Sequence, residues 1–114
     1  MSSNKDELQN RTRDGLSALD RLLEHRARLA ICVLLSRERR FSFSRLKQVL
    51  GETDGSLGAH LRKLEDAGYV AVNKEFADRK PVSWYRLEPQ GRDALTRHLG
   101  GLSRLIAEAG KGPS

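Results

Sequence analysis

The spacing of leucines changes several times along this 114-residue chain, and each change predicts a new element. Residues 1–14 are polar and charged, so we expect a flexible segment there. Leucines at helical spacing from Gly15 onward predict a first helix that ends near Glu24 or His25. Residues 26–37 are apolar on nearly every side, which predicts a central buried helix.

A pair of short helices is predicted next. Residues 38–43 break the helical pattern and are expected to form a minimal strand. Ser44 is the predicted N-cap of a helix that ends at Gly51, and Thr53 is the predicted N-cap of a second helix that ends at Gly68. Two helices joined by such a short turn have the arrangement of a helix-turn-helix.

A β-hairpin is predicted after Tyr69, where the hydrophobic period changes to two. Val70 and Val72 are expected to point inward. In the run 83–87, Tyr85 and Leu87 share a face, so this run is the predicted second strand. Residues 75–82 lie between the two runs and predict a long, basic loop at the hairpin tip.

The last predicted element is a helix from Pro89, a residue that suits a first helical turn. Its apolar residues follow one another at steps of four and three, and they are Leu95, Leu99, Leu102, Ile106 and Ala109. Packing onto the domain is one interpretation, but this stripe offers more apolar surface than so small a core can cover. We therefore expect a dimer seam. The residues expected in it are Leu16, Leu19 and Leu23 of the first helix with Leu95, Leu99, Leu102 and Ile106 of the last. Gly100 and Gly101 weaken the last helix but allow close approach of another helix.

The order of these elements predicts one domain over residues 15–109, with a flexible tail at 110–114. The predicted fold class is mainly α with a small β-hairpin, in the form of a winged helix-turn-helix with an extended C-terminal dimerisation helix.

The charge of the chain favours an acidic partner. Lysine and arginine number 21 against 15 aspartate and glutamate residues, a net charge of +6. Nucleic acid is the first candidate partner and a membrane surface the second. The chain contains no apolar run long enough to cross a bilayer and no secretory signal, so we expect a cytoplasmic protein without a membrane partner.

Few residues offer chemistry. Cys32 is the only cysteine, which excludes an internal disulfide, and its apolar surroundings predict a buried thiol. We expect no metal site and no cofactor, because no clustered histidine and cysteine spacing occurs. An enzyme is not expected, since the chain lacks a nucleophile-base pair, a glycine-rich phosphate loop and an HExxH motif.

The predicted second helix of the pair, residues 53–67, has two unlike sides. Leu57, Leu61 and Leu64 fall on one side at 100° per residue. The other side is small or basic and carries Gly55, Ser56, Ala59, Arg62 and Lys63. Small residues let a helix enter a DNA major groove about 12 Å wide, where Ser56 and Lys63 can reach base edges or phosphates. A merely solvated surface is the alternative.

Several neighbouring residues have two open interpretations. Glu52 and Asp54 either favour the helix N-terminus electrostatically or, for Asp54, accept a hydrogen bond from a cytosine. His60 either touches phosphate or covers the preceding helix. On the predicted wing, residues 74–83, the cations either contact phosphates or a minor groove, or belong to a solvated loop. Trp84 either supports the wing or offers a contact surface.

The full set of predicted DNA contacts combines the helix pair and the wing. It consists of Ser44, Arg45, Thr53, Asp54, Gly55, Ser56, Ala59, His60, Arg62 and Lys63 with Lys74, Arg79 and Lys80.

Three motifs, "TDGSLGAHLRKLEDAGYV", "RKPVSWYRL" and "PQGRDAL", resemble a bacterial and archaeal family of small winged-helix transcriptional regulators related to the MarR and ArsR groups. The likeness covers residues 19 to about 105. It implies a homodimer that binds operator DNA. Where members of the family often carry a His-Pro pair, this chain has His25 and Arg26.

We therefore expect a homodimeric, sequence-specific regulator that binds double-stranded DNA. The alternative is a winged-helix module that binds protein or RNA. The sequence identifies no small-molecule effector.

Overall fold

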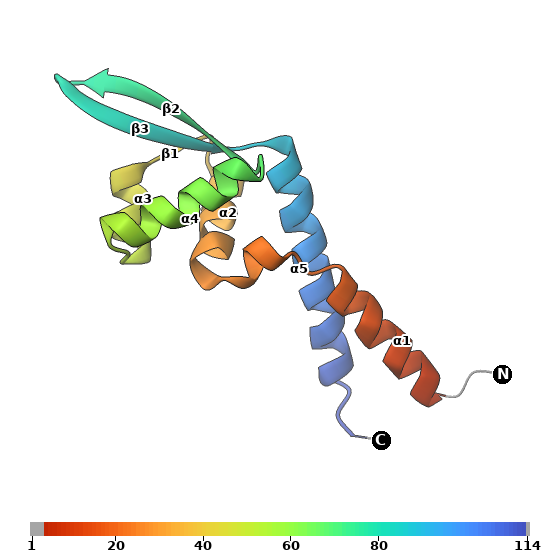
Figure 1. Ribbon diagram of the computed structural model, residues 1–114. Coiled ribbons are helices and arrows are strands. Elements are labelled where there is room, and N and C mark those ends of the chain that lie inside the picture. The colour runs from red at the N-terminus through yellow and green to blue at the C-terminus, as the bar shows by residue number, and fades with distance from the viewer. Residues whose placement is uncertain (1–3, 114) are drawn as a thin grey trace.

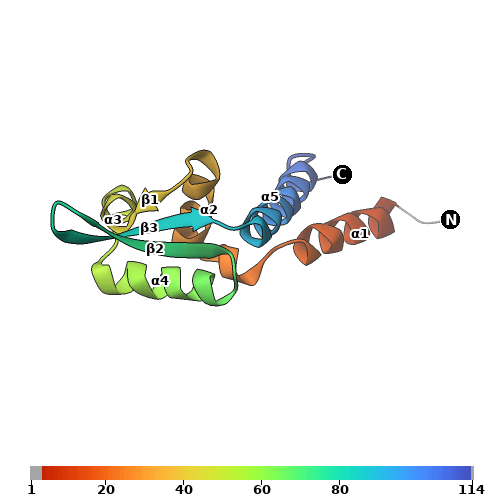
Figure 2. The same cartoon turned by 90° about the horizontal axis from the view of Figure 1, so that it is seen from above.

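The computed structural model describes residues 4–113 and has an elongated shape of 68 × 25 × 22 Å (Figure 1). Its elements in chain order are α1 (Asn4–Ser17), the 3-10 turn η1 (Arg21–Glu24), α2 (Arg26–Arg37), β1 (Phe41–Ser42), α3 (Phe43–Leu50), α4 (Asp54–Asp66), β2 (Val70–Ala77), β3 (Lys80–Leu87) and α5 (Pro89–Ala109). Residues 21–88 form a lobe, and α1 lies beside α5 in an arm that extends away from it (Figures 1 and 2). Residues 1–3 of the predicted flexible segment and residue 114 of the predicted tail lie outside the described residues.

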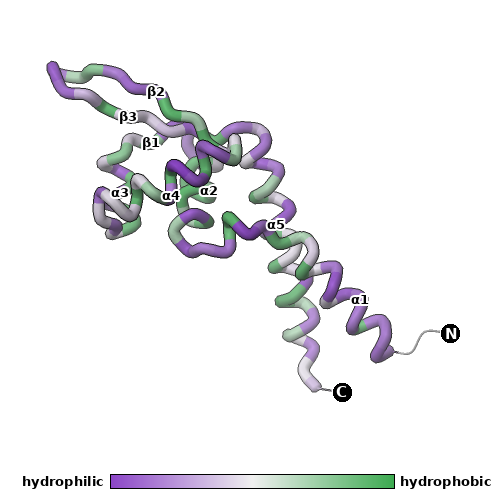
Figure 3. Tube along the Cα trace, in the orientation of Figure 1, coloured by the Kyte–Doolittle hydropathy of each residue, from purple (hydrophilic) through white to green (hydrophobic). Residues whose placement is uncertain are grey.

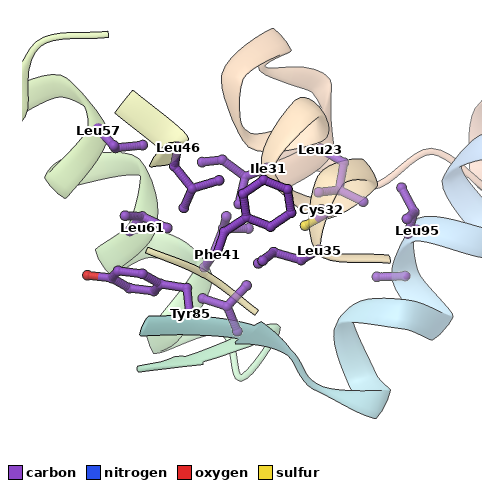
Figure 4. Packing of buried hydrophobic residues seen from close by; sticks show 13 residues of the cluster. Leu23, Ile31, Cys32, Leu35, Phe41, Leu46, Leu57, Leu61, Tyr85 and Leu95 are labelled. Carbon is purple, nitrogen blue, oxygen red and sulfur yellow. The ribbon is translucent and has the colours of Figure 1, made fainter. Parts of the chain in front are cut away.

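The core of the lobe is built around α2, as its apolar sequence predicts. Ile31, Cys32 and Leu35 of α2 are buried and meet leucines of α3 and α4 (Figure 4). Phe41 and Tyr85 close the core from the sheet, whose strand order is β1-β3-β2. The hydropathy of the chain follows this arrangement, because the segments that meet inside the lobe are the hydrophobic ones (Figure 3).

The helix-turn-helix is confirmed, with one cap corrected. The Thr53 hydroxyl accepts a hydrogen bond from the Ser56 backbone at 3.1 Å, and Gly51 has the left-handed φ of 65° that ends α3. The N-cap of α3 is Ser42 rather than Ser44, since the Ser42 hydroxyl accepts from the Arg45 backbone at 3.2 Å. Ser42 belongs to β1, which pairs with β3, and the extended backbone there places its hydroxyl ahead of the first turn.

The strands of the hairpin are longer than predicted, and the prediction of a long basic loop at residues 75–82 is wrong. β2 and β3 pair continuously from Val70 with Leu87 to Ala77 with Lys80. Only Asp78 and Arg79 lie in the turn, both with positive φ, as in a type I′ hairpin turn. Alternation of hydrophobic and polar residues disappears in this stretch because the ribbon extends past the core and neither face is covered (Figure 2).

The first helix also differs from its prediction. α1 begins at Asn4 and ends at Ser17, and the leucines around Leu22 belong to the separate turn η1. The polar residues 4–14, predicted to be flexible, are helical in α1. Nearly half of them are asparagine, aspartate or threonine, which have low helix propensity, so the helix depends on its docking site on α5, far away in the sequence.

Gly15 of α1 and Gly101 of α5 set the distance between these two helices. A Cβ added at Gly101 would lie 2.6 Å from the Gly15 carbonyl oxygen, whereas a Cβ at Gly100 would meet nothing within 4 Å. The close approach predicted for the glycine pair is therefore made by Gly101, and the approaching helix is α1 of the same chain.

Candidate nucleic-acid interface

The side of α4 that faces away from the core is open and nearly flat. Leu57, Leu61 and Leu64 are buried, as predicted. On the opposite side, Gly55 and Ala59 are exposed, and an added Cβ at Gly55 would meet nothing within 4 Å. Arg62 and Lys63 are exposed toward the other end of the helix. A rod-shaped partner can therefore approach the helix axis closely along this side.

The acidic residues at the start of α4 have partners inside the lobe. Asp54 pairs with Lys47 of α3 at 2.8 Å, and Glu52 accepts a hydrogen bond from the Ser56 hydroxyl at 2.7 Å. Both carboxylates lie at the positive end of the α4 dipole. This arrangement favours the structural interpretation of Asp54 over a contact with cytosine.

His60 packs against the start of α2. The Arg28 guanidinium lies 3.0 Å from His60 Nδ1, and the centroids of the His25 and His60 rings are 4.2 Å apart. Burial, followed by the electrostatic influence of His25 and Arg28, lowers the pKa of His60, which favours the neutral ring. His60 therefore packs against α2 and not against α3, the helix that precedes it, and a contact of its ring with phosphate stays a prediction. His25 also caps α2 through a 3.1 Å bond from the Ala27 backbone, which makes the bend without a proline.

The two predicted contacts on α3 differ in freedom. Ser44 is exposed. Arg45 forms a two-pronged ion pair with Glu38 at 2.6 and 2.9 Å and lies over the Phe41 ring. The Glu38 carboxylate thus competes with any phosphate for the Arg45 guanidinium.

The ribbon of β2 and β3 carries unpaired positive charge. Lys74, Arg79 and Lys80 are exposed, and none of them forms an ion pair within residues 4–113. A hollow of about 370 Å³ separates the ribbon from α4, and Arg62 and Lys74 are among the residues that line it. Lys74 lies on the face of the ribbon that lines the hollow, whereas Lys80, which pairs with Ala77, lies on the opposite face. Glu65 and Asp66 also line the hollow, so its lining carries both signs of charge.

The opposite face of the ribbon has a different character. Arg40 lies 3.9 Å above the centroid of the Trp84 ring and pairs with Glu75 at 3.1 Å. Trp84 therefore packs against Arg40 at the base of the ribbon, which favours the supporting role, and its use as a contact surface stays a prediction. Sequence reasoning placed Phe76 in a loop and missed that its ring is 80% exposed near the tip.

The residues predicted for a dimer seam fall into two groups. Leu16, Leu99 and Ile106 are 56, 43 and 70% exposed, and Leu19 and Leu102 are half-buried. Leu23 and Leu95 are instead part of the lobe core (Figure 4), so the structure corrects their assignment to a surface. Leu8 of α1 is also exposed and was missed, although its position eight residues before Leu16 keeps it on the same side of the helix.

The remaining candidates for chemistry are inert. Burial raises the pKa of the Cys32 thiol to about 12, so it stays protonated at neutral pH. Among residues 4–113, no group of three histidine, cysteine or acidic side chains is placed to hold a metal ion. No helix in the described part of the chain is long and apolar enough to span a membrane.

A helix-turn-helix followed by a ribbon on a three-stranded sheet defines a winged helix. Residues 27–106 match the family described as the winged helix DNA-binding domain, and the chain belongs to that family. The chain is a DNA-binding transcriptional regulator by family, and such regulators are not enzymes.

Known proteins agree with this placement. A transcriptional regulator homologue from Pyrococcus horikoshii OT3 is 34% identical with a TM-score of 0.71, over 75% of this chain and 85% of that one. A protein of uncharacterised function from Methanocaldococcus jannaschii is 32% identical over 72 residues, which are 63% of this chain and 78% of the relative. MarR from E. coli, at 15% identity, shares the fold with a TM-score of 0.63 over 100% of this chain and 88% of its own. The predicted likeness to the MarR group is therefore confirmed at the level of the fold, and that to the ArsR group stays a prediction.

Proposed function

We propose that the protein is a homodimeric, sequence-specific regulator that places α4 in the major groove of double-stranded DNA. The ribbon of β2 and β3 then lies on the phosphate backbone or in the adjacent minor groove. The observation that carries this proposal is the open side of α4, together with three exposed cations of the ribbon that form no ion pair within residues 4–113. A regulator of this kind would act in the cytoplasm, on chromosomal DNA.

The small residues of α4 support the recognition of base edges by a helix that lies deep in the major groove. Gly55 and Ala59 leave room for base edges, while Arg62 and Lys63 supply hydrogen-bond donors at the rim. The Ser56 hydroxyl donates to Glu52, so it would exchange that hydrogen bond for one to DNA. Thr53 and Asp54 are occupied within the fold, so we assign them to helix formation rather than to direct readout. On the wing, Lys74, Arg79 and Lys80 are proposed to neutralise phosphates.

The shape of the chain supports a dimer. Its radius of gyration is 17.8 Å, whereas a compact chain of this length would have about 13 Å. The excess comes from the arm, where Leu16, Leu99 and Ile106 face outward. A second copy packed on this arm by two-fold symmetry would bury these residues and present two α4 helices to a palindromic site.

The DNA contact is tested with a duplex selected from random sequences by the purified protein. Ala59→Glu should weaken binding to this duplex by more than about tenfold, because the longer acidic side chain blocks the groove and repels phosphate. Gln90→Glu adds the same charge at the first turn of α5 and should leave the affinity unchanged. Equal affinities of both variants and the wild type would place the contact elsewhere.

An RNA duplex of the same sequence serves as the competitor. The deep, narrow major groove of A-form RNA does not admit a helix, so the RNA should fail to displace the DNA. Efficient displacement would favour the RNA-binding alternative.

The dimer is tested by sedimentation at micromolar concentration. The wild type should have twice the chain mass of 12.8 kDa. Leu99→Glu combined with Ile106→Glu should give the monomer, since both side chains are already exposed in one chain and their replacement spares the lobe core. A monomeric wild type would contradict the dimer.

A further inference from the structure

Phe76 is the most exposed of the large hydrophobic residues that the structure describes, at 80%. It pairs across the ribbon with Pro81, one step before the pair that flanks the turn, so both lie at the tip of the wing (Figures 1 and 2). An aromatic ring left in water gains none of the free energy that burial provides. Its position therefore points to a partner that covers the ring.

The pleat of the ribbon determines which way Phe76 points. Alternate residues of a strand share a face, so Phe76 lies on the same face as Val70, Val72 and Lys74. Val70 is buried in the lobe core, and Val72 and Lys74 line the hollow beside α4. Phe76 therefore projects from the side of the ribbon that faces the open region of α4.

The surroundings of Phe76 favour one class of partner. Lys74 lies two residues before it, and Arg79 and Lys80 follow it around the turn, all three without ion pairs within residues 4–113. Lys74 shares the face of Phe76, Lys80 lies on the opposite face, and the turn also holds the exposed carboxylate of Asp78, so cations flank the apolar pair without surrounding it. Apolar side chains flanked by cations match a DNA minor groove, where the walls carry phosphates and the floor accepts an apolar wedge between base steps. Phenylalanine and proline are both among the residues that act as such wedges.

We propose that Phe76, supported by Pro81, enters the minor groove beside the segment read by α4 and partly unstacks one base step. The inference rests on the proposed function and adds a second source of specificity to it. Pyrimidine–purine steps such as TA unstack easily, so the wing reads the deformability of the flanking step rather than its hydrogen-bond pattern.

The test uses the selected duplex with its flanking step set to TA or to a stiffer AA. 2-Aminopurine replaces the adenine of the TA step and fluoresces more strongly when it unstacks. The wild type should prefer TA and raise the fluorescence. Phe76→Ala should bind the TA duplex about tenfold more weakly than the wild type and should bind the AA duplex almost as well. The fluorescence of 2-aminopurine should not rise when this variant binds.

Three further variants separate the wedge from other roles. Val82 lies on the opposite face of the ribbon from Phe76, one pair further from the tip. Val82→Ala should therefore have the wild-type affinity for both duplexes and the wild-type rise in fluorescence. Phe76→Leu should keep part of the TA preference, because leucine is also a wedge. Arg79→Ala should flatten the dependence of affinity on salt, whereas Phe76→Ala should leave that slope unchanged, since an apolar contact releases no counterions.

Each outcome bears on a separate statement. If Phe76→Ala keeps the wild-type preference for TA and the fluorescence rise, the wedge is wrong. If Phe76→Ala alters self-association in sedimentation without altering DNA binding, the ring covers a second copy of the chain and the proposal is overturned. If the wild type selects no duplex at all, the proposed function fails before the wing is tested.

Discussion

The lobe and the arm use leucine in opposite ways. In the lobe, Leu57, Leu61 and Leu64 are buried by helices and strands of the same chain. In the arm, α1 and α5 meet at a glycine crossing, and large apolar residues such as Ile106 remain outside. Folding of one chain therefore accounts for the burial of these leucines of the lobe but leaves Leu16, Leu99 and Ile106 of the arm exposed, as the proposed dimer would require.

The largest expected effect comes from the lobe core. Leu61→Ala should lower the free energy of unfolding by about 2–5 kcal/mol, because it leaves a cavity in a packed core. Leu16→Ala removes the same atoms from an exposed site of the arm and should cost far less at concentrations where the chain is monomeric. Urea unfolding followed by circular dichroism measures both. Similar losses would mean that the arm is as tightly packed within one chain as the lobe.

The glycine crossing gives the next largest effect. Gly101→Ala should lower the free energy of unfolding by about 1–3 kcal/mol, because the new methyl group would overlap with the Gly15 carbonyl oxygen of α1. Gly100→Ala is the matched control, and it should raise the stability by up to about 1 kcal/mol through helix propensity. Hydrogen exchange of α1 amides should accelerate in the first variant alone. Unchanged exchange there would show that α1 does not depend on this contact.

The junction between lobe and arm should respond more moderately. Tyr69 donates from its hydroxyl to the Asp20 carboxylate, and the Asp20 backbone donates to Nδ1 of the buried His98 on α5 at 2.9 Å. Tyr69→Phe should cost about 1–2 kcal/mol, since it leaves the carboxylate short of a donor.

The effect of Tyr69 should also depend on pH. Burial, followed by the hydrogen bond to Asp20, raises the pKa of Tyr69 to about 12. The folded state therefore favours the neutral phenol, and this stabilisation is complete below about pH 10 and is lost as the pH rises toward 12. The difference in unfolding free energy between wild type and Tyr69→Phe should narrow over that range. A constant difference would contradict the linkage.

The smallest effects are expected from two ion pairs at the surface, in one of which the Glu108 side chain is only 10% exposed. Arg11 and Glu108 join α1 to α5 at 2.5 Å, while Glu38 and Arg45 join neighbouring segments of the lobe. Their hydrogen bonds to arginine lower the pKa of both carboxyl groups, so their stabilisation is present above about pH 4.5 and is lost at lower pH. Glu108→Gln should speed hydrogen exchange in α1 at pH 7, whereas Glu38→Gln should leave the exchange of the lobe unchanged. The reverse result would remove the distinction between the two regions.

The sequence predicts those parts of the molecule whose stabilising contacts leave a local pattern. Leu57, Leu61 and Leu64 are spaced for one helix face, and Thr53 and Gly51 mark helix ends by their own chemistry. Ser42 and Ser44 are equally plausible caps by residue type, and only the pairing of β1 with β3 decides between them.

Two other regions could not be predicted, for the same physical reason. The polar residues of α1 resemble a flexible segment because their docking surface is on α5, more than half the chain away. The outer half of the ribbon packs against nothing in one chain, so hydrophobic and polar residues do not alternate there. The sequence therefore does not predict that Phe76 lies in a strand. The grouping of Arg62 with Lys74 around one hollow likewise depends on how β2 lies against α4.

The turn at the tip of the ribbon holds two side-chain-bearing residues in a conformation that glycine prefers, with φ of 51° at Asp78 and 66° at Arg79. Asparagine and aspartate tolerate this region, but a long side chain such as arginine stores strain of about 1 kcal/mol there. Arg79→Gly would therefore make the hairpin more stable and at the same time remove its foremost cation. If Arg79 contacts phosphate as proposed, selection for tighter folding and selection for nucleic-acid affinity oppose each other at the tip. A thermostabilised version of this protein that gains glycine there should then be a weaker regulator.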